Sequence, residues 1–187
     1  QGQRFSNEMR GYSEHAAEVA AQPDHIAWDI YDSKGDEAGM GFYDYREIRK
    51  LGAIKSADSL EELASITGLP LASLRTEFEN IETSARTGEP DRFGRSFTQD
   101  EVLRAPYYAV KVNGALFHTQ GGLVINGHAQ VLREDGVAFP NLLAGGGAAR
   151  GVSGDANYGY LSGNGLLTAT SFGRLAGTTA ARIAAES

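Results

Sequence analysis

Two glycine-rich stretches, residues 145–154 and 160–165, follow one another near the end of the chain. The second opens a run of Ala, Gly and Leu that predicts a terminal helix over residues 163–186, with small side chains suited to close packing. A helix N-terminus carries unpaired backbone N–H groups and the positive end of the helix dipole. Such an end suits a phosphate or another anionic group. Two glycine loops at a helix N-terminus therefore predict a cradle for a cofactor.

The first glycine-rich stretch departs from the dinucleotide-binding fingerprint. That fingerprint needs G-x-G-x-x-G after a strand, with a helix directly behind it. Gly145 and Gly147 supply the first two glycines, but Arg150 stands where the third belongs, and no helix is expected there. The stretch is therefore not the pyrophosphate loop of a Rossmann unit, and on its own it also fits a surface turn.

The composition is that of a globular chain, long enough for one ordinary domain or for two incomplete ones. Of its 187 residues, 41% are hydrophobic and 22% are charged. No apolar run approaches the roughly 20 residues of a membrane span, so none is expected. The first residues, QGQR, include neither Met nor the apolar stretch of a signal peptide. They predict a chain cut from a longer polypeptide.

Charge and residue usage exclude several classes of function. The net charge is −7 without a basic cluster, so nucleic acid is not an expected partner. The sequence contains no Cys, which excludes disulfides and thiolate chemistry and suits the cytoplasm, the expected location. Its four histidines, at positions 15, 25, 118 and 128, lack the spacing of metal ligands, so no metal site is expected.

A helical hairpin is the clearest local prediction. Ser59 and Glu62 have the spacing of a capping box and start one helix, which the Gly-Leu-Pro sequence at 68–70 ends. A second helix begins near Leu71 and carries one apolar face as far as Gly88.

The remaining pattern mixes short strands and helices. Before the hairpin, the expected elements are a strand at 3–7, a helix at 8–21 and a strand at 25–31. A glycine-rich loop from residue 34, followed by a short charged helix at 45–51, is expected next. After Pro106, short strands are expected at 107–112, 122–126, 129–133 and 141–144. The chain is thus expected to be α+β, with a mostly helical part at residues 1–105. A β-rich part at residues 106–187 ends in the long helix.

Several motifs occur in an order typical of one flavoprotein family. They are GQRFSNE (2–8), ADSLEELA (57–64), FGR (93–95), APYYAVKV (105–112), HTQGGL (118–123), AQVL (129–132), NLLAGG (141–146), SGNGLL (162–167) and FGRLAG (172–177). The chain resembles the cap and the C-terminal flavin-domain segment of the fumarate reductase/succinate dehydrogenase flavoprotein superfamily. That superfamily includes the 3-ketosteroid dehydrogenases.

The resemblance implies FAD as the cofactor, a cap (substrate) domain at residues 1–105, and a segment of the FAD-binding domain at residues 106–187. In this family an N-terminal βαβ unit holds the ADP half of FAD, and nothing in the sequence matches that unit. The missing N-terminal half of the same polypeptide is therefore an expected partner. The residues expected at the cofactor are Gly121, Gly122, Gly146, Gly147, Gly163, Asn164, Gly165, Leu166 and Leu167.

The resemblance also implies a set of catalytic residues. Where fumarate-reducing members have a proton-donating Arg and a carboxylate-clamping Arg, this sequence has Tyr12 and Tyr160. His118 stands at the position of a substrate-binding His. Two phenols in place of two guanidiniums disfavour a dicarboxylate. They resemble the ketosteroid dehydrogenases, in which one Tyr moves a proton beside a ketone and another binds its carbonyl. Tyr160 and Ser162 have the spacing of the Δ4(5α) branch of those enzymes.

The expected activity is hydride transfer between flavin and a C–C bond adjacent to a carbonyl in a small-molecule substrate. Two alternatives remain open. Arg10 and Arg150 would suit a fumarate reductase-type enzyme that acts on a carboxylic acid, and a non-catalytic binding module would need no flavin. Tyr158 would take the place of Tyr160 if the alignment shifts by two residues.

Overall fold

The computed structural model describes residues 1–116, 118–154 and 156–186, and its chain forms two compact units, Gln1–Gly114 and Ala115–Ser187. The domain division predicted after residue 105 stays a prediction, while the compact units divide after Gly114. They divide there because strand β3 (Tyr107–Asn113) is the central strand of the sheet of the first unit. In the described part of the chain, no helix combines the length and apolarity needed to cross a membrane.

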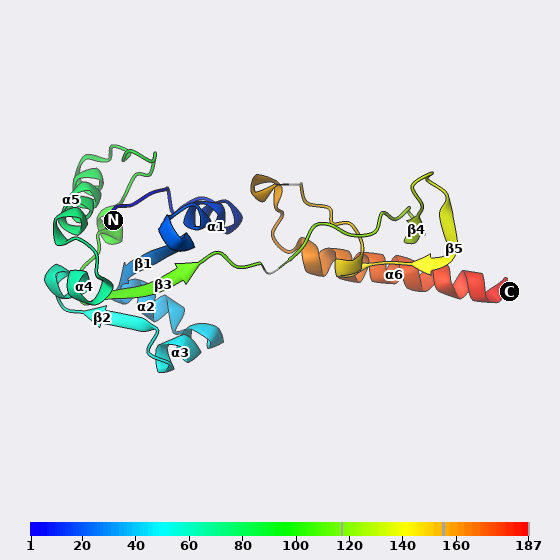
Figure 1. Ribbon diagram of the computed structural model, residues 1–187, viewed down its shortest axis with the longest axis horizontal. Helices are drawn as coiled ribbons and strands as arrows, with labels where there is room; N and C mark the ends of the chain where they lie inside the picture. The colour runs from blue at the N-terminus through cyan, green and yellow to red at the C-terminus, as the bar shows by residue number, and fades with distance from the viewer. Residues whose placement is uncertain (117, 155, 187) are drawn as a thin grey trace. The chain divides into compact units, whose positions relative to one another are not determined.

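The first unit is built on a three-stranded antiparallel sheet in the order β1-β3-β2, as Figure 1 shows. Strand β1 spans Ile26–Asp32 and pairs along the full length of β3, while the short β2 spans Ile54–Ala57. The helices of this unit are α1 (Tyr12–Ala20), α2 (Ser33–Gly39), α3 (Tyr43–Lys50), α4 (Leu60–Thr67) and α5 (Leu71–Thr87), with 3-10 turns at Pro23–His25 and Gln99–Glu101.

The predicted helical hairpin is confirmed as α4 and α5. The Ser59 hydroxyl accepts a hydrogen bond from the Glu62 N–H at 3.1 Å, and the Glu62 carboxylate accepts one from the Asp58 N–H at 2.8 Å. Gly68 and Gly88 end the two helices in the left-handed conformation, which Gly adopts without steric cost. Leu63 of α4 is fully buried against the sheet, so the hairpin supplies much of the core.

Two expectations for the first unit are wrong. Residues 3–7 form no strand, and the helix expected from residue 8 begins only at Tyr12. Helix α2 lies where a loop was expected. Its Gly35 packs against the ring of Tyr31, where an added Cβ would come within 2.9 Å, and this tertiary contact has no local sequence signal.

The second unit has a two-stranded antiparallel sheet, β4 (Gln130–Leu132) with β5 (Ala138–Leu143), and the long helix α6 (Asn164–Ala185). Single turns of 3-10 helix occur at Gly146–Ala148 and Asn157–Gly159. Residues 122–126 form only isolated bridges, so the strand expected there is wrong. The small core of the second unit consists of Val131, Ala144 and Ala149, against which the half-buried rings of Phe139 and Phe172 pack. The α+β class and the long terminal helix are confirmed.

Candidate functional site

The first glycine loop of the second unit packs directly on α6. A Cβ added to Gly145 would lie 3.1 Å from the Cβ of Phe172, and one added to Gly146 would lie 3.4 Å from the Cβ of Ala169. Gly146 also has a positive φ of 56°, a conformation that most side chains disfavour. The backbone of this loop therefore packs against the N-terminal half of α6, most tightly at Gly145.

The segment around Gly122 runs beside the end of the same loop. A Cβ on Gly122 would come within 2.5 Å of the carbonyl carbon of Ala149. Backbone hydrogen bonds join the two segments: Leu123 N–H donates to Ala148 O, and Arg150 N–H donates to Leu123 O, both at 2.9 Å. Two glycine segments that are distant in the sequence thus lie side by side.

His118 lies against the first turn of α6. A Cβ on Gly165 would lie 3.3 Å from the imidazole ring. Gly163 precedes the helix with a φ of 80°, and Asn164, the first residue of α6, is 2% exposed. The buried His118 Nε2 and Asn164 Oδ1 have no hydrogen-bond partner among the residues that the structure describes. Buried polar atoms are normally paired, so these two indicate that a polar ligand completes the site.

These positions fit the flavin ring. Its pyrimidine edge offers both an N–H donor and carbonyl acceptors, which match the Asn164 Oδ1 that lacks a described partner and the N–H groups that begin α6. The close contacts described above involve four of the expected cofactor residues: Gly122, Gly146, Asn164 and Gly165. Two others, Leu166 and Leu167, lie on the helix and are 80% and 60% exposed. Gly121, Gly147 and Gly163 are exposed on the connecting backbone. Their role in binding FAD stays a prediction.

The expected catalytic residues divide between the two units. Tyr12 is the first residue of α1 and is 64% exposed. Tyr160 is half-buried and Ser162 exposed, and both lie on the second unit's loop before α6, as does the exposed Tyr158. The structure thus brings His118 to the start of α6, while a site shared by Tyr12 and Tyr160 stays a prediction.

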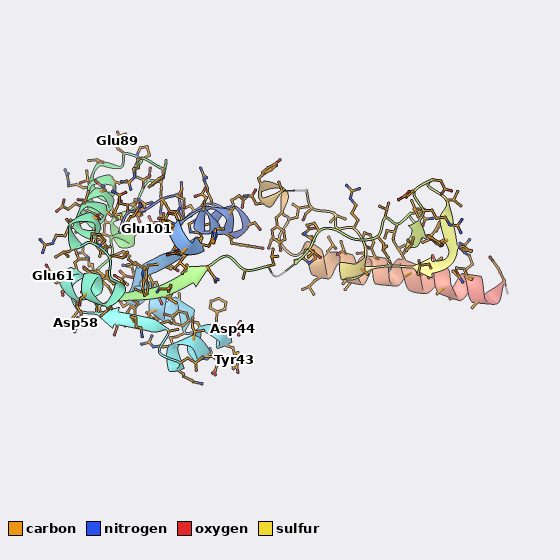
Figure 2. All side chains as sticks on the ribbon, viewed as in Figure 1. Tyr43, Asp44, Asp58, Glu61, Glu89 and Glu101 are labelled. Carbon is orange, nitrogen blue, oxygen red and sulfur yellow. The ribbon has the colours of Figure 1, made fainter. Side chains whose placement is uncertain are left out.

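An ion-pair network holds the chain segment that leads to Tyr12. Arg4 donates from Nε and Nη2 to the two oxygens of Glu8, at 2.7 Å each, and Arg95 donates to Glu8 at 2.8 Å and to Glu101 at 3.1 Å. Arg4 also pairs with Asp91. Figure 2 labels Glu101 in this unit. Burial alone would raise the pKa of Glu8, but the hydrogen bonds from Arg4 and Arg95 outweigh it and lower that pKa.

This network was not predicted, although Arg4, Glu8 and Arg95 lie in the GQRFSNE and FGR motifs. The sequence signal that could have revealed the network is the presence of arginines in both motifs and of a glutamate in the first, since opposite charges in two separated motifs can pair in the folded chain. Arg10, which the alternative function assigns to an anionic substrate, instead pairs with Glu18. The two side chains line a hollow of about 280 Å³ together with Phe5 and Asn7. Glu18 offsets the charge of Arg10, which weakens Arg10 as an anion clamp.

Comparison with known proteins identifies the class of protein that carries this arrangement. A family described as the FAD binding domain matches residues 1–166. The probable fumarate reductase Ifc3 of Shewanella frigidimarina is 33% identical over 99% of this chain and 30% of its own length. The 4-oxocyclohex-2-ene-1-carboxylate 5-dehydrogenase of Sinomonas cyclohexanicum is 30% identical over 98% of this chain and 35% of its own length.

Solved structures agree with these relatives. The open conformation of a flavocytochrome c3 fumarate reductase superposes with a TM-score of 0.72 at 31% identity, over 98% of this chain and 31% of that one. The 3-ketosteroid Δ1-dehydrogenase of Sterolibacterium denitrificans gives 0.71 at 27% identity, over 100% and 38%. The chain belongs to the FAD-binding flavoprotein family that includes the fumarate reductases and the 3-ketosteroid dehydrogenases. It spans about a third of the length of the two relatives named above.

Proposed function

We propose that the chain is part of an enzyme that oxidises or reduces a C–C bond adjacent to a carbonyl in a small-molecule substrate. The observation that carries the proposal is a pair of buried polar atoms at the start of α6, His118 Nε2 and Asn164 Oδ1, which have no hydrogen-bond partner among the described residues. Gly165 lets the imidazole ring pack against this turn of the helix. When bound there, FAD supplies a site that accepts or donates hydride.

Each candidate residue then has a distinct role. Tyr12 takes or gives the proton on the carbon beside the carbonyl. Because the ordinary pKa of a phenol is about 10, this role needs a nearby group that stabilises the phenolate. Tyr160 and Ser162 hydrogen-bond the carbonyl oxygen of the substrate. His118 holds the substrate through Nε2, which has no partner among the described residues. The glycine loops and the first turn of α6 hold the flavin.

A second candidate is a fumarate reductase-type enzyme that acts on a carboxylic acid. It is supported by the similarity to the probable fumarate reductase of Shewanella frigidimarina. Against it stand Tyr12 and Tyr160 in place of two guanidiniums, and the pairing of Arg10 with Glu18. A substrate carboxylate would have to outcompete an ion pair that already exists.

The rest of the FAD-binding domain is the proposed partner of the second unit. Leu166, Leu167 and Leu175 of α6 are 80%, 60% and 40% exposed. This is apolar surface that the bound flavin and the remainder of the polypeptide would cover together, and its burial would stabilise the assembled domain.

Anaerobic flavin spectroscopy on the flavin-loaded enzyme tests the proposal. A saturated ketosteroid or cyclic ketone should bleach the oxidised flavin, whereas succinate should leave it unchanged. Bleaching by succinate alone would favour the second candidate. A full-length protein that purifies colourless and takes up no added FAD would favour a non-catalytic binding module.

A further inference from the structure

The loop that carries Tyr160 and Ser162 is tied to α6 by Ser153, which is not among the expected site residues. Ser153 Oγ accepts a hydrogen bond from the backbone N–H of Leu161 at 2.9 Å. The same oxygen accepts a second hydrogen bond from Nδ2 of Asn164. One hydroxyl therefore joins the beginning of the loop to its end and to the first residue of the helix.

The orientation of the Asn164 amide is fixed by its surroundings. Its Nδ2 also donates to the carbonyl oxygen of Leu161 at 2.7 Å, and a carbonyl can only accept. Both hydrogens of the amide nitrogen are therefore used within the loop. Asn164 is 2% exposed, and the Thr168 hydroxyl donates to its backbone oxygen at 2.8 Å, so the side chain has a rigid base.

Two glycines close the same loop a little farther along. Gly154 N–H donates to Gly159 O at 2.8 Å. A Cβ added to Gly159 would come within 2.6 Å of the Gly154 Cα, so the backbone at Gly159 packs directly on the backbone at Gly154. Tyr160 is the first residue after this closure and Ser162 follows two residues later. Their backbone thus lies between the glycine closure and the tie formed by Ser153.

We infer that Ser153 and Asn164 are positioning residues that hold Tyr160 and Ser162 in place for the proposed reaction. This inference rests on the proposed function. Tyr160 and Ser162 both lie within four residues of Asn164 on a loop whose two ends are joined, so loss of the tie loosens the backbone that carries them. A displacement of about 1 Å at a reacting group can cost roughly a hundredfold in rate.

Hydrogen–deuterium exchange on the 187-residue chain tests the tie without any assay of activity. Ser153→Ala should speed amide exchange in residues 157–164 by about tenfold, equivalent to about 1.4 kcal/mol. Ser153→Thr retains a hydroxyl and should restore the slower exchange. Thr178→Ala is the matched control, because it removes a hydroxyl that donates to Arg174 O at 3.0 Å on the exposed part of α6. Exchange that is unchanged in Ser153→Ala would overturn the inference.

Steady-state kinetics on the flavin-loaded enzyme test the positioning. Ser153→Ala should lower kcat by about ten- to a hundredfold. Its KM and flavin absorbance should stay close to those of the parent enzyme, and Ser153→Thr should restore turnover. A loosened loop with full kcat would overturn the positioning role. A parent enzyme that binds flavin but turns over no carbonyl substrate would overturn the proposed function alone, because the exchange experiment does not depend on turnover.

Discussion

Replacing Glu8 by Gln removes the charge at the centre of the network that precedes Tyr12. Glu8 receives two hydrogen bonds from Arg4 and one from Arg95, and its side chain is 38% exposed against 14% and 16% for the two arginines. An exposed ion pair contributes about 0.2–1 kcal/mol, and good bidentate geometry favours the upper end of that range. Two guanidiniums on one carboxylate, discounted for its exposure, therefore give about 1–2 kcal/mol of stability.

Urea unfolding of the 187-residue chain measures this loss. With a slope of about 2 kcal/mol per molar urea, Glu8→Gln should lower the midpoint by roughly 0.5–1 M. Glu61→Gln is the control, since Glu61 on α4 (Figure 2) pairs with Arg75 and both side chains are more than half exposed. It should move the midpoint much less. Equal shifts for the two variants would refute the view that the network holds the segment before α1.

The pH dependence of the same difference follows from the sign of the pKa shift. The folded state lowers the pKa of Glu8, so its contribution to stability is full above the unfolded pKa of about 4.3 and disappears as the pH falls through the lower folded value. The parent chain and Glu8→Gln should therefore differ at pH 7 and converge below about pH 4. A difference that persists undiminished in acid would contradict the ionic origin of the effect.

Three further predictions concern the proposed site. In the flavin-loaded enzyme, Tyr12→Phe should reduce kcat by about 10²–10⁴-fold, and Tyr160→Phe should reduce it by about 10²–10³-fold. Both variants should retain flavin. A Tyr12→Phe enzyme with full turnover would remove Tyr12 from the mechanism. Gly122→Ala should reduce flavin content and thermal stability, because its Cβ would lie 2.5 Å from backbone, whereas Gly127→Ala, with nothing within 4 Å, should reduce neither. The 187-residue chain alone should bind FAD more weakly than micromolar, about −8 kcal/mol, since its sequence lacks a pyrophosphate-binding loop; titration by flavin fluorescence measures this.

Local signals predicted the helices with their own start and stop residues. Ser59, Glu62 and Gly68 fix the ends of α4 through hydrogen bonds and φ values that involve only near neighbours in the chain. Strand β3 was also recognised from its own residues, but its place in the molecule was not. A strand carries no local record of its partners, and β3 pairs with β1 and β2, which lie about fifty to eighty residues earlier.

The glycines show where sequence information about the site ends. A cluster of glycines predicts close backbone approach, and Gly122, Gly146 and Gly165 each make such an approach. The neighbour of each glycine is set by tertiary packing. Gly122 faces Ala149, Gly146 faces Ala169, and Gly165 faces the ring of His118. The sequence could therefore locate a cradle without giving its shape.

Ser153 illustrates the same limit for a single polar residue. A Ser in a glycine-rich loop most often forms a local turn, so its type and spacing give no reason to single it out. Only the folded backbone places Leu161 N–H and Asn164 Nδ2 around one hydroxyl.

The two proposed catalytic phenols, Tyr12 and Tyr160, lie on segments that are held by different interactions. An ionic network holds the segment before Tyr12, whereas neutral hydrogen bonds hold the loop of Tyr160. High salt should therefore weaken the first support and leave the second largely intact, because ions screen exposed charges and not neutral hydrogen bonds.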